Sequence, residues 1–235
     1  MGGAASDQGE IHLSSPDGNR FMAYFARAAE PSGSGVAILP DVRGLHLFYK
    51  ELAQRFAEAG LDAVAIDYFG RTAGDGTRDE TFEFMPHVQQ VTMDQLALDV
   101  GAALAYLRSP QGGAVSRAFT VGFCFGGSSS LNQAALQDQL DGAIGLYGMP
   151  SRSRPYIATM HAPLLVIAAG QDRSTSPEES QAFDAELTQA QVAHRMVVYP
   201  NAPHSFFDRH QVDFAGESAD AWEQMLGFIR EPATS

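Results

Sequence analysis

Short apolar runs alternate with amphipathic segments along most of the sequence. The apolar runs have the length of buried strands, and they occupy residues 35–40, 61–67, 119–123, 141–148, 162–170 and 195–200. The segments between and after them carry apolar residues at helical spacing, and they occupy residues 47–60, 91–109, 125–136, 176–189 and 219–231. Buried strands that alternate with helices predict an α/β fold with a mostly parallel central sheet and helices on both faces.

Turn-forming residues mark several boundaries of these elements. The segment Ser-Pro-Asp-Gly-Asn at 15–19 predicts a hairpin near the start of the chain, and Gly60 is placed to end the first helix. Residues 67–80 are rich in glycine and predict a loop. Because no Gly-, Ser- or Pro-rich linker and no long repeat interrupts the alternation, we expect one domain over residues 1–235, with about residues 1–10 disordered.

Composition and charge narrow the classes of function. The chain has 235 residues, 45% of them hydrophobic, and a formal net charge of -13, which disfavours binding to nucleic acid or to an anionic membrane surface. No apolar run reaches the roughly 18 residues of a membrane-spanning helix. A single cysteine excludes an internal disulfide and favours a reducing, cytoplasmic location. The histidines lack the spacing of a metalloprotease motif, so we expect neither a metal nor a cofactor.

The cysteine occupies a motif that points to catalysis. It lies in the sequence Val-Gly-Phe-Cys-Phe-Gly-Gly at 121–127, between a predicted strand and a predicted helix. This pattern matches the nucleophile elbow of α/β-hydrolases, whose central residue is usually serine and is here Cys124. The N-terminus of the following helix would stabilise a thiolate at this position. The motif alone leaves open a small buried cysteine that only packs between helix and sheet.

Two more candidates follow later strands. Asp172 comes directly after the run 162–170, and His204 follows the run 195–200. Ligand chemistry on open α/β sheets gathers at the carboxyl ends of the strands, and α/β-hydrolases carry their nucleophile, acid and histidine in this order along the chain. Taken singly, Asp172 is equally a turn residue and His204 a solvated loop residue. Together with Cys124 they predict a catalytic triad.

The same segments resemble the dienelactone hydrolase family of α/β-hydrolases. The resemblance runs from about residue 35 to the C-terminus and rests on the segments LPDVRG (39–44), AIDYFGRTAG (65–74), GFCFGG (122–127), AAGQD (168–172) and PNAPHSF (200–206). It implies the α/β-hydrolase fold and a triad in which cysteine replaces serine. By this resemblance Cys124 is the nucleophile, His204 the base and Asp172 the residue that orients the histidine.

The expected chemistry is hydrolysis of a small carboxylic ester or lactone through a thioester acyl-enzyme. Two backbone N–H groups are expected to stabilise the oxyanion, one from Phe125 and one from Val42 in the loop after the first inner strand. We expect broad activity on short-chain esters, in a monomer or small homo-oligomer. The alternatives are a specialist carboxymethylenebutenolidase acting on anionic dienelactones, and a non-catalytic binding protein on the same scaffold.

Asp41 departs from the family pattern. The family usually has a glutamate here, and the resemblance implies that its carboxylate contacts the thiol in the resting enzyme. Aspartate is one methylene shorter, so Asp41 has three interpretations: it contacts the thiol, it pairs with Arg43, or it caps the turn in LPDVRG.

The substrate contacts are predicted from residue type and from the resemblance. Arg71 and Arg78 are candidates for holding a substrate carboxylate, whereas Arg209 is displaced by one residue from the family spacing, with Asp208 in its place. Acidic neighbours weaken affinity for an anion, which favours neutral esters over anionic lactones. Apolar walls are expected from three aromatic residues, for which core packing is the alternative: Phe82, Tyr147 and Phe206.

Overall fold

The computed structural model describes residues 5–232, which form two compact units that divide after Thr120. Strand β5 (Arg117–Phe123) runs across this division.

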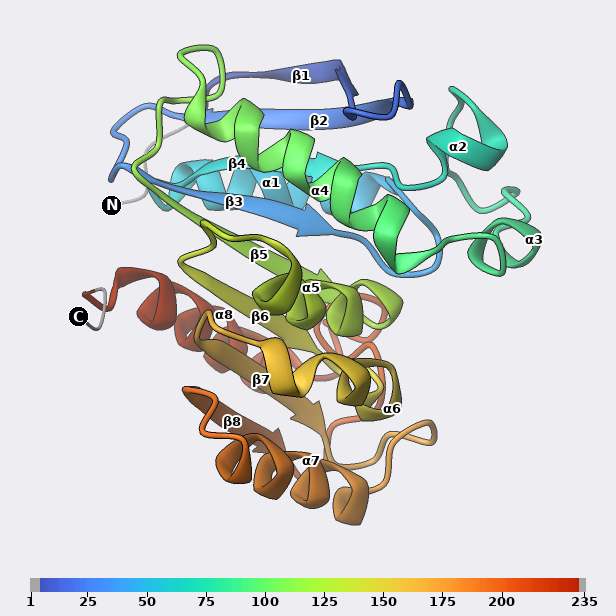
Figure 1. The fold of residues 1–235 in the computed structure, drawn as a ribbon, viewed down its shortest axis with the longest axis vertical. Coiled ribbons are helices and arrows are strands. Elements are labelled where there is room, and N and C mark those ends of the chain that lie inside the picture. The colour runs from blue at the N-terminus through green and yellow to red at the C-terminus, as the bar shows by residue number, and fades with distance from the viewer. Residues whose placement is uncertain (1–4, 233–235) are drawn as a thin grey trace. The chain divides into compact units, whose positions relative to one another are not determined.

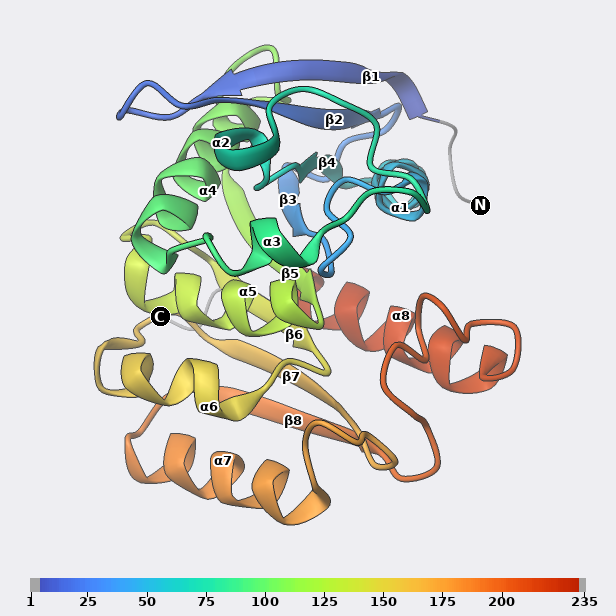
Figure 2. The same cartoon turned by 90° about the vertical axis from the view of Figure 1, so that its right-hand side faces the viewer.

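The first unit combines an antiparallel hairpin with parallel strands. Its strands lie in the order β1-β2-β4-β3, and their bounds are β1 Ala5–Ser14, β2 Arg20–Ala28, β3 Ser34–Leu39 and β4 Asp62–Ile66. Strands β3 and β4 are parallel, with Val36 opposite Ala63, and all their residues are buried. Helix α1 (Leu47–Glu58) and helix α4 (Met93–Arg108) cover opposite faces of these strands (Figures 1 and 2). Two single-turn helices, α2 (Gly70–Ala73) and α3 (Met85–Val88), lie in the segment between β4 and α4.

The second unit is built on parallel strands in the order β6-β7-β8. The bounds are β6 Gly142–Leu146, β7 Leu164–Ala169 and β8 His194–Tyr199. Helices α5 (Phe125–Leu136) and α7 (Pro177–Gln189) cover one face of these strands, and α8 (Ala215–Arg230) covers the other (Figures 1 and 2). A short helix α6 (Pro150–Ser153) continues into the 3-10 helix η1 (Arg154–Thr159).

The prediction of a mostly parallel α/β sheet with helices on both faces is confirmed, and the exception lies in the first unit, where β2 pairs antiparallel with both β1 and β4. The predicted hairpin at 15–19 is also confirmed, because Ser15 N–H donates to Asn19 O at 2.9 Å between β1 and β2. Gly60 follows the end of α1 with φ 88°, a left-handed conformation that glycine adopts without strain.

Some elements differ from the predictions. Residues 5–10 were expected to be disordered but belong to β1, because this edge strand is held by backbone pairing with β2 rather than by an apolar run. Residues 1–4 of that expectation lie outside the described residues. Helices α2, α3 and α6 were not predicted, since each is a single turn without a helical apolar period. Helix α8 begins at Ala215 rather than at 219. The single-domain organisation stays a prediction.

Candidate active site

Cys124 occupies a sharp turn between β5 and α5. Its φ of 56° and ψ of -114° are strained for a residue that carries a Cβ. The turn is held by backbone hydrogen bonds, because Cys124 N–H donates to Leu146 O at 3.0 Å and Cys124 O accepts from Gly127 N–H at 3.0 Å. Strained backbone that the surrounding hydrogen bonds maintain is typical of functional sites.

Glycines make this turn sterically feasible. A Cβ added to Gly122 would lie 1.9 Å from Gly126 O, and one added to Gly127 would lie 2.5 Å from Leu146 O. Both positions therefore exclude a side chain unless the backbone moves. As a result β5, the turn and the first residues of α5 pack closely, and the Cys124 side chain is left partly exposed at the N-terminus of a 12-residue helix.

Asp172 and His204 lie in the loops that follow β7 and β8. A backbone hydrogen bond joins these loops, because Gln171 N–H donates to Ala202 O at 2.9 Å. Asp172 Oδ2 lies 2.6 Å from His204 Nδ1, and its side chain is only 1% exposed. Since an ionised carboxylate can only accept, His204 Nδ1 carries the hydrogen and donates it. The other carboxylate oxygen of Asp172 accepts from Ser174 N–H at 2.7 Å.

The Cys124 side chain also acts on His204, since it is one of the two groups that raise the pKa of the histidine. Because Nδ1 faces Asp172, the remaining ring nitrogen Nε2 is the one available to the thiol. Burial lowers the pKa of His204, but the hydrogen bonds and charges of Asp172 and Cys124 outweigh it and raise the pKa to about 10. The histidine is therefore an imidazolium at neutral pH, placed between a buried carboxylate and a thiol.

Aromatic side chains pack around the imidazole. The ring of Tyr147 lies 5.0 Å from that of His204, and the ring of Phe206 lies 5.7 Å from that of Tyr147. Tyr147 is 2% exposed, and Phe206 is fully buried, where it also contacts Tyr199. In the structure Tyr147 thus packs against the histidine, and Phe206 packs against Tyr147 within the core of the second unit.

In the first unit Asp41 caps a turn and forms an ion pair. Its carboxylate is fully buried and accepts from Arg43 N–H at 2.9 Å and from Arg43 Nε at 2.9 Å. These contacts match two of the three interpretations of Asp41. The next residue, Val42, lies in the turn after β3, and its backbone N–H makes no hydrogen bond among residues 5–232.

Arg71 is surrounded by carboxylates of its own unit. It lies 2.6 Å from Asp17 and 2.8 Å from Asp99, whose side chain is 1% exposed. Asp99 also accepts hydrogen bonds from Ser15 and Asn19. Arg71 thus ties the β1–β2 turn to α4.

Arg78 is likewise paired. Its guanidinium is buried and lies 2.8 Å from Asp67 Oδ2, 2.5 Å from Gly74 O and 4.5 Å over the ring of Phe82. The ring of Phe82 stacks in turn on that of His87 at 5.2 Å. Burial raises the pKa of Asp67, whereas Arg78 acts in the opposite direction. The two arginines predicted to hold a substrate anion are both engaged by carboxylates of the protein.

Two further groups near Asp172 were not found from the sequence. Ser174 contributes through its backbone N–H, which has no side-chain signature beyond the Asp-x-Ser spacing of an Asx turn. Thr175 lines a pocket beside Asp172, and no sequence signal distinguishes it from other loop threonines.

Within the described part of the chain, no group of three or more His, Cys, Asp or Glu side chains is arranged to hold a metal ion. No helix among residues 5–232 has the length and apolar character needed to span a bilayer.

Comparisons with known proteins agree with the resemblance. Residues 21–232 match the Dienelactone hydrolase family. A protein of Escherichia coli (strain K12) named "Putative carboxymethylenebutenolidase" is 29% identical over 227 residues, which cover 91% of this chain and 83% of that protein.

Solved structures show the same fold. A "Putative Dienelactone Hydrolase" from Klebsiella pneumoniae subsp. pneumoniae MGH 78578 superposes with a TM-score of 0.83 at 24% identity, over 97% of this chain and 100% of that one. A dienelactone hydrolase-like promiscuous phosphotriesterase from metagenomic libraries gives a TM-score of 0.79 at 23% identity, over 97% and 98%. The predicted α/β-hydrolase fold is thereby confirmed.

Proposed function

The chain belongs to the dienelactone hydrolase family, and from this premise we propose that it hydrolyses small carboxylic esters or lactones with Cys124 as nucleophile. The observation that carries the proposal is the series Asp172–His204–Cys124, in which Asp172 hydrogen-bonds to His204, Cys124 raises the pKa of His204, and Cys124 occupies a strained turn before a helix. Nucleophile, base and orienting acid within hydrogen-bond reach are the arrangement that covalent catalysis requires.

The reaction begins with the Cys124 thiolate beside the His204 imidazolium. The sulfur attacks the ester carbonyl, and the oxygen becomes an oxyanion that accepts a hydrogen bond from the backbone N–H of Phe125. Collapse of this intermediate breaks the ester bond, His204 protonates the leaving alcohol, and a thioester remains on Cys124. His204, now neutral, removes a proton from water, which attacks the thioester and releases the acid. A second oxyanion donor from Val42 stays a prediction.

Asp172 keeps the histidine in the tautomer that this cycle needs. Its hydrogen bond to Nδ1 leaves Nε2 to exchange protons with the leaving alcohol and with water. Its charge stabilises the imidazolium, in agreement with the raised pKa of His204 of about 10.

We propose short, neutral esters as the principal substrates. A guanidinium that already faces two carboxylates, as Arg71 does, carries little net charge with which to attract a substrate anion. Arg78 is neutralised by Asp67 in the same way. The alternative is a specialist for anionic dienelactones.

We also propose that the protein is cytoplasmic and that it is a monomer or small homo-oligomer.

A substrate profile combined with trapping of the intermediate tests this function. The purified protein is assayed with p-nitrophenyl acetate, p-nitrophenyl butyrate and a carboxylate-bearing dienelactone, and samples quenched during turnover are analysed by mass spectrometry. We expect hydrolysis of both neutral esters and an acyl group on the peptide that contains Cys124. Absence of hydrolysis, or an acyl group on a different residue during turnover, would contradict the proposal.

A further prediction concerns Arg78, which we expect to determine stability rather than selectivity. Arg78→Ala leaves Asp67, a carboxylate that is 1% exposed, without its cation. Breaking a buried pair in this way costs about 3–5 kcal/mol of unfolding free energy, measured by urea denaturation. The ratio of kcat/KM between the dienelactone and p-nitrophenyl acetate should stay near that of the wild type.

The double variant Arg78→Ala with Asp67→Asn is the matched control. Removing the buried charge as well should recover part of the lost stability. A loss of kcat/KM confined to the anionic lactone would instead identify Arg78 as a substrate-binding residue and favour the specialist.

A further inference from the structure

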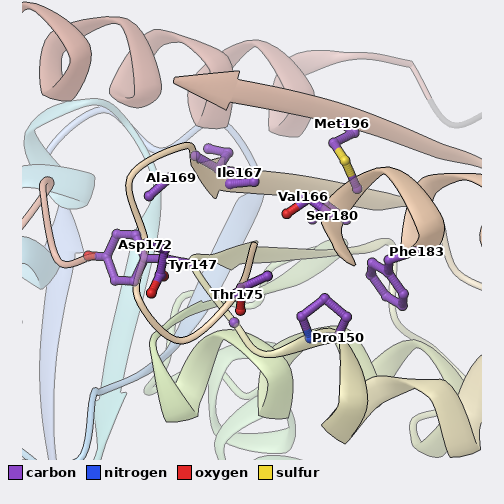
Figure 3. Close-up of a pocket in the computed structure, with 12 residues that line it drawn as sticks. Tyr147, Pro150, Val166, Ile167, Ala169, Asp172, Thr175, Ser180, Phe183 and Met196 are labelled. Atoms are coloured by element: carbon purple, nitrogen blue, oxygen red, sulfur yellow. The ribbon is translucent and has the colours of Figure 1, made fainter. Parts of the chain in front are cut away.

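A pocket in the second unit lies directly against the side chain of Asp172. It is lined by the turn between β6 and α6, by β7, by the loop that carries Asp172, by α7 and by β8. Figure 3 shows Asp172 and Tyr147 on one side of it, Phe183 and Met196 on the other, and Thr175 between them. The pocket has room for about one water molecule, so its size excludes a substrate-sized ligand.

Thr175 places an unusual polar group in this pocket. The residue is 7% exposed, and its Oγ1 atom is buried without a hydrogen-bond partner among the described residues. A buried hydroxyl without a partner costs free energy, and in native proteins such groups are normally satisfied by the protein or by ordered water. The remaining wall beside Thr175 is largely apolar, with Val166, Phe183 and Met196.

The Asp172 carboxylate is the complementary group. It can accept about four hydrogen bonds, and it receives one from Ser174 N–H and one from His204. Its side chain is 1% exposed, so further donors must come from inside the protein. One water molecule between Thr175 and Asp172 would form a hydrogen bond with the Thr175 hydroxyl and donate a second one to the Asp172 carboxylate.

We propose that this pocket is an internal water site in which Thr175 Oγ1 and the Asp172 carboxylate share one water molecule. Through this water Thr175 acts as a positioning residue, because it fixes and stabilises the ionised carboxylate that orients His204. The inference rests on the proposed function, in which Asp172 orients the catalytic base.

The isosteric substitution Thr175→Val tests the role of the hydroxyl. It removes the polar atom and preserves the shape of the side chain, so it leaves the pocket without its anchor for water. We expect kcat to fall about 10-fold, because the charged Asp172 carboxylate loses the hydrogen bond from the water. KM should be nearly unchanged, because this hydrogen bond does not contact the substrate. Because the ionised carboxylate loses a donor, the acid limb of the pH profile of kcat/KM should move to higher pH.

Two variants control this experiment. Thr175→Ser keeps the hydroxyl and should retain the pH profile of the wild type. Thr188→Val makes the same chemical change on α7, where the exposed hydroxyl donates to Asp184 O, and should change neither kcat nor the pH profile. Crystal structures of the wild type and of Thr175→Val should show the water in the first and not in the second.

A different outcome is expected if Thr175 does not position Asp172. If Thr175 is only an unsatisfied buried hydroxyl, Thr175→Val will be as stable as the wild type or more stable, with unchanged kcat and pH profile. That outcome, or a wild-type crystal structure without water in the pocket, overturns the inference while ester hydrolysis remains. Loss of ester hydrolysis in the wild type itself would instead overturn the proposed function.

Discussion

Cys124→Ala is expected to abolish ester hydrolysis without unfolding the protein. The variant lacks the sulfur that would form the thioester, and loss of a nucleophile from a catalytic triad lowers kcat by a factor on the order of 10⁴–10⁶. The fold should be retained because the turn is held by backbone hydrogen bonds and by Gly122 and Gly127 rather than by the thiol. Alanine keeps the Cβ and so adds no strain at φ 56°.

The measurement is kcat with p-nitrophenyl acetate alongside the melting temperature. Cys124→Ser is the matched variant, since it replaces only the sulfur atom. A hydroxyl is far less acidic than a thiol, so His204 and Asp172 must remove its proton during attack, and we expect reduced but measurable turnover. Turnover by Cys124→Ala at the rate of the wild type would remove Cys124 from the mechanism.

Within the candidate site, the sequence predicts best those residues that lie in a recognisable local motif. The elbow around Cys124 is such a case, because the close approach of Gly122 to Gly126 O and of Gly127 to Leu146 O demands glycine at fixed offsets. Asp172 and His204 were located by their position after buried strands. Long apolar periods likewise identified α1, α4 and α7.

Interactions that depend on which other residue lies nearby in the fold could not be predicted from the local sequence. The sequence offered Arg71 and Arg78 as cations for a substrate, yet Arg71 is paired with Asp17 and with Asp99 on α4, and Arg78 is paired with the buried Asp67. A basic residue in a loop looks the same whether its partner is a substrate or a buried aspartate. Residues 5–10 of strand β1 were missed for a similar reason, since backbone pairing with β2 rather than apolar burial holds them in place.

Asp172→Asn is the sharpest test of the electrostatics of the candidate triad. Asparagine keeps the size of the side chain but removes the charge that helps to hold the pKa of His204 at about 10. Burial still acts to lower this pKa and Cys124 still acts to raise it, so in the variant the pKa should fall from about 10 toward the usual value near 6.5. A smaller fraction of the imidazole is then charged at pH 7–8, so it stabilises a thiolate less.

We therefore expect Asp172→Asn to lower kcat/KM for p-nitrophenyl acetate about 10²–10⁴-fold, the usual worth of positioned acid–base catalysis. Alkylation by iodoacetamide should slow at pH 7 and require higher pH to reach half of its maximal rate. The matched control is Asp138→Asn, which changes an exposed aspartate of the same unit.

The effect of Asp172→Asn on the stability of the protein has a defined sign. A histidine whose folded pKa is raised contributes stability that is complete below its unfolded pKa, near 6.5, and that is lost as the pH rises through about 10. The variant should thus be less stable than the wild type at pH 6, and this difference should shrink between pH 7 and 10. A stability difference that stays constant across this range, together with an unchanged alkylation profile, would show that Asp172 does not act through the charge of His204.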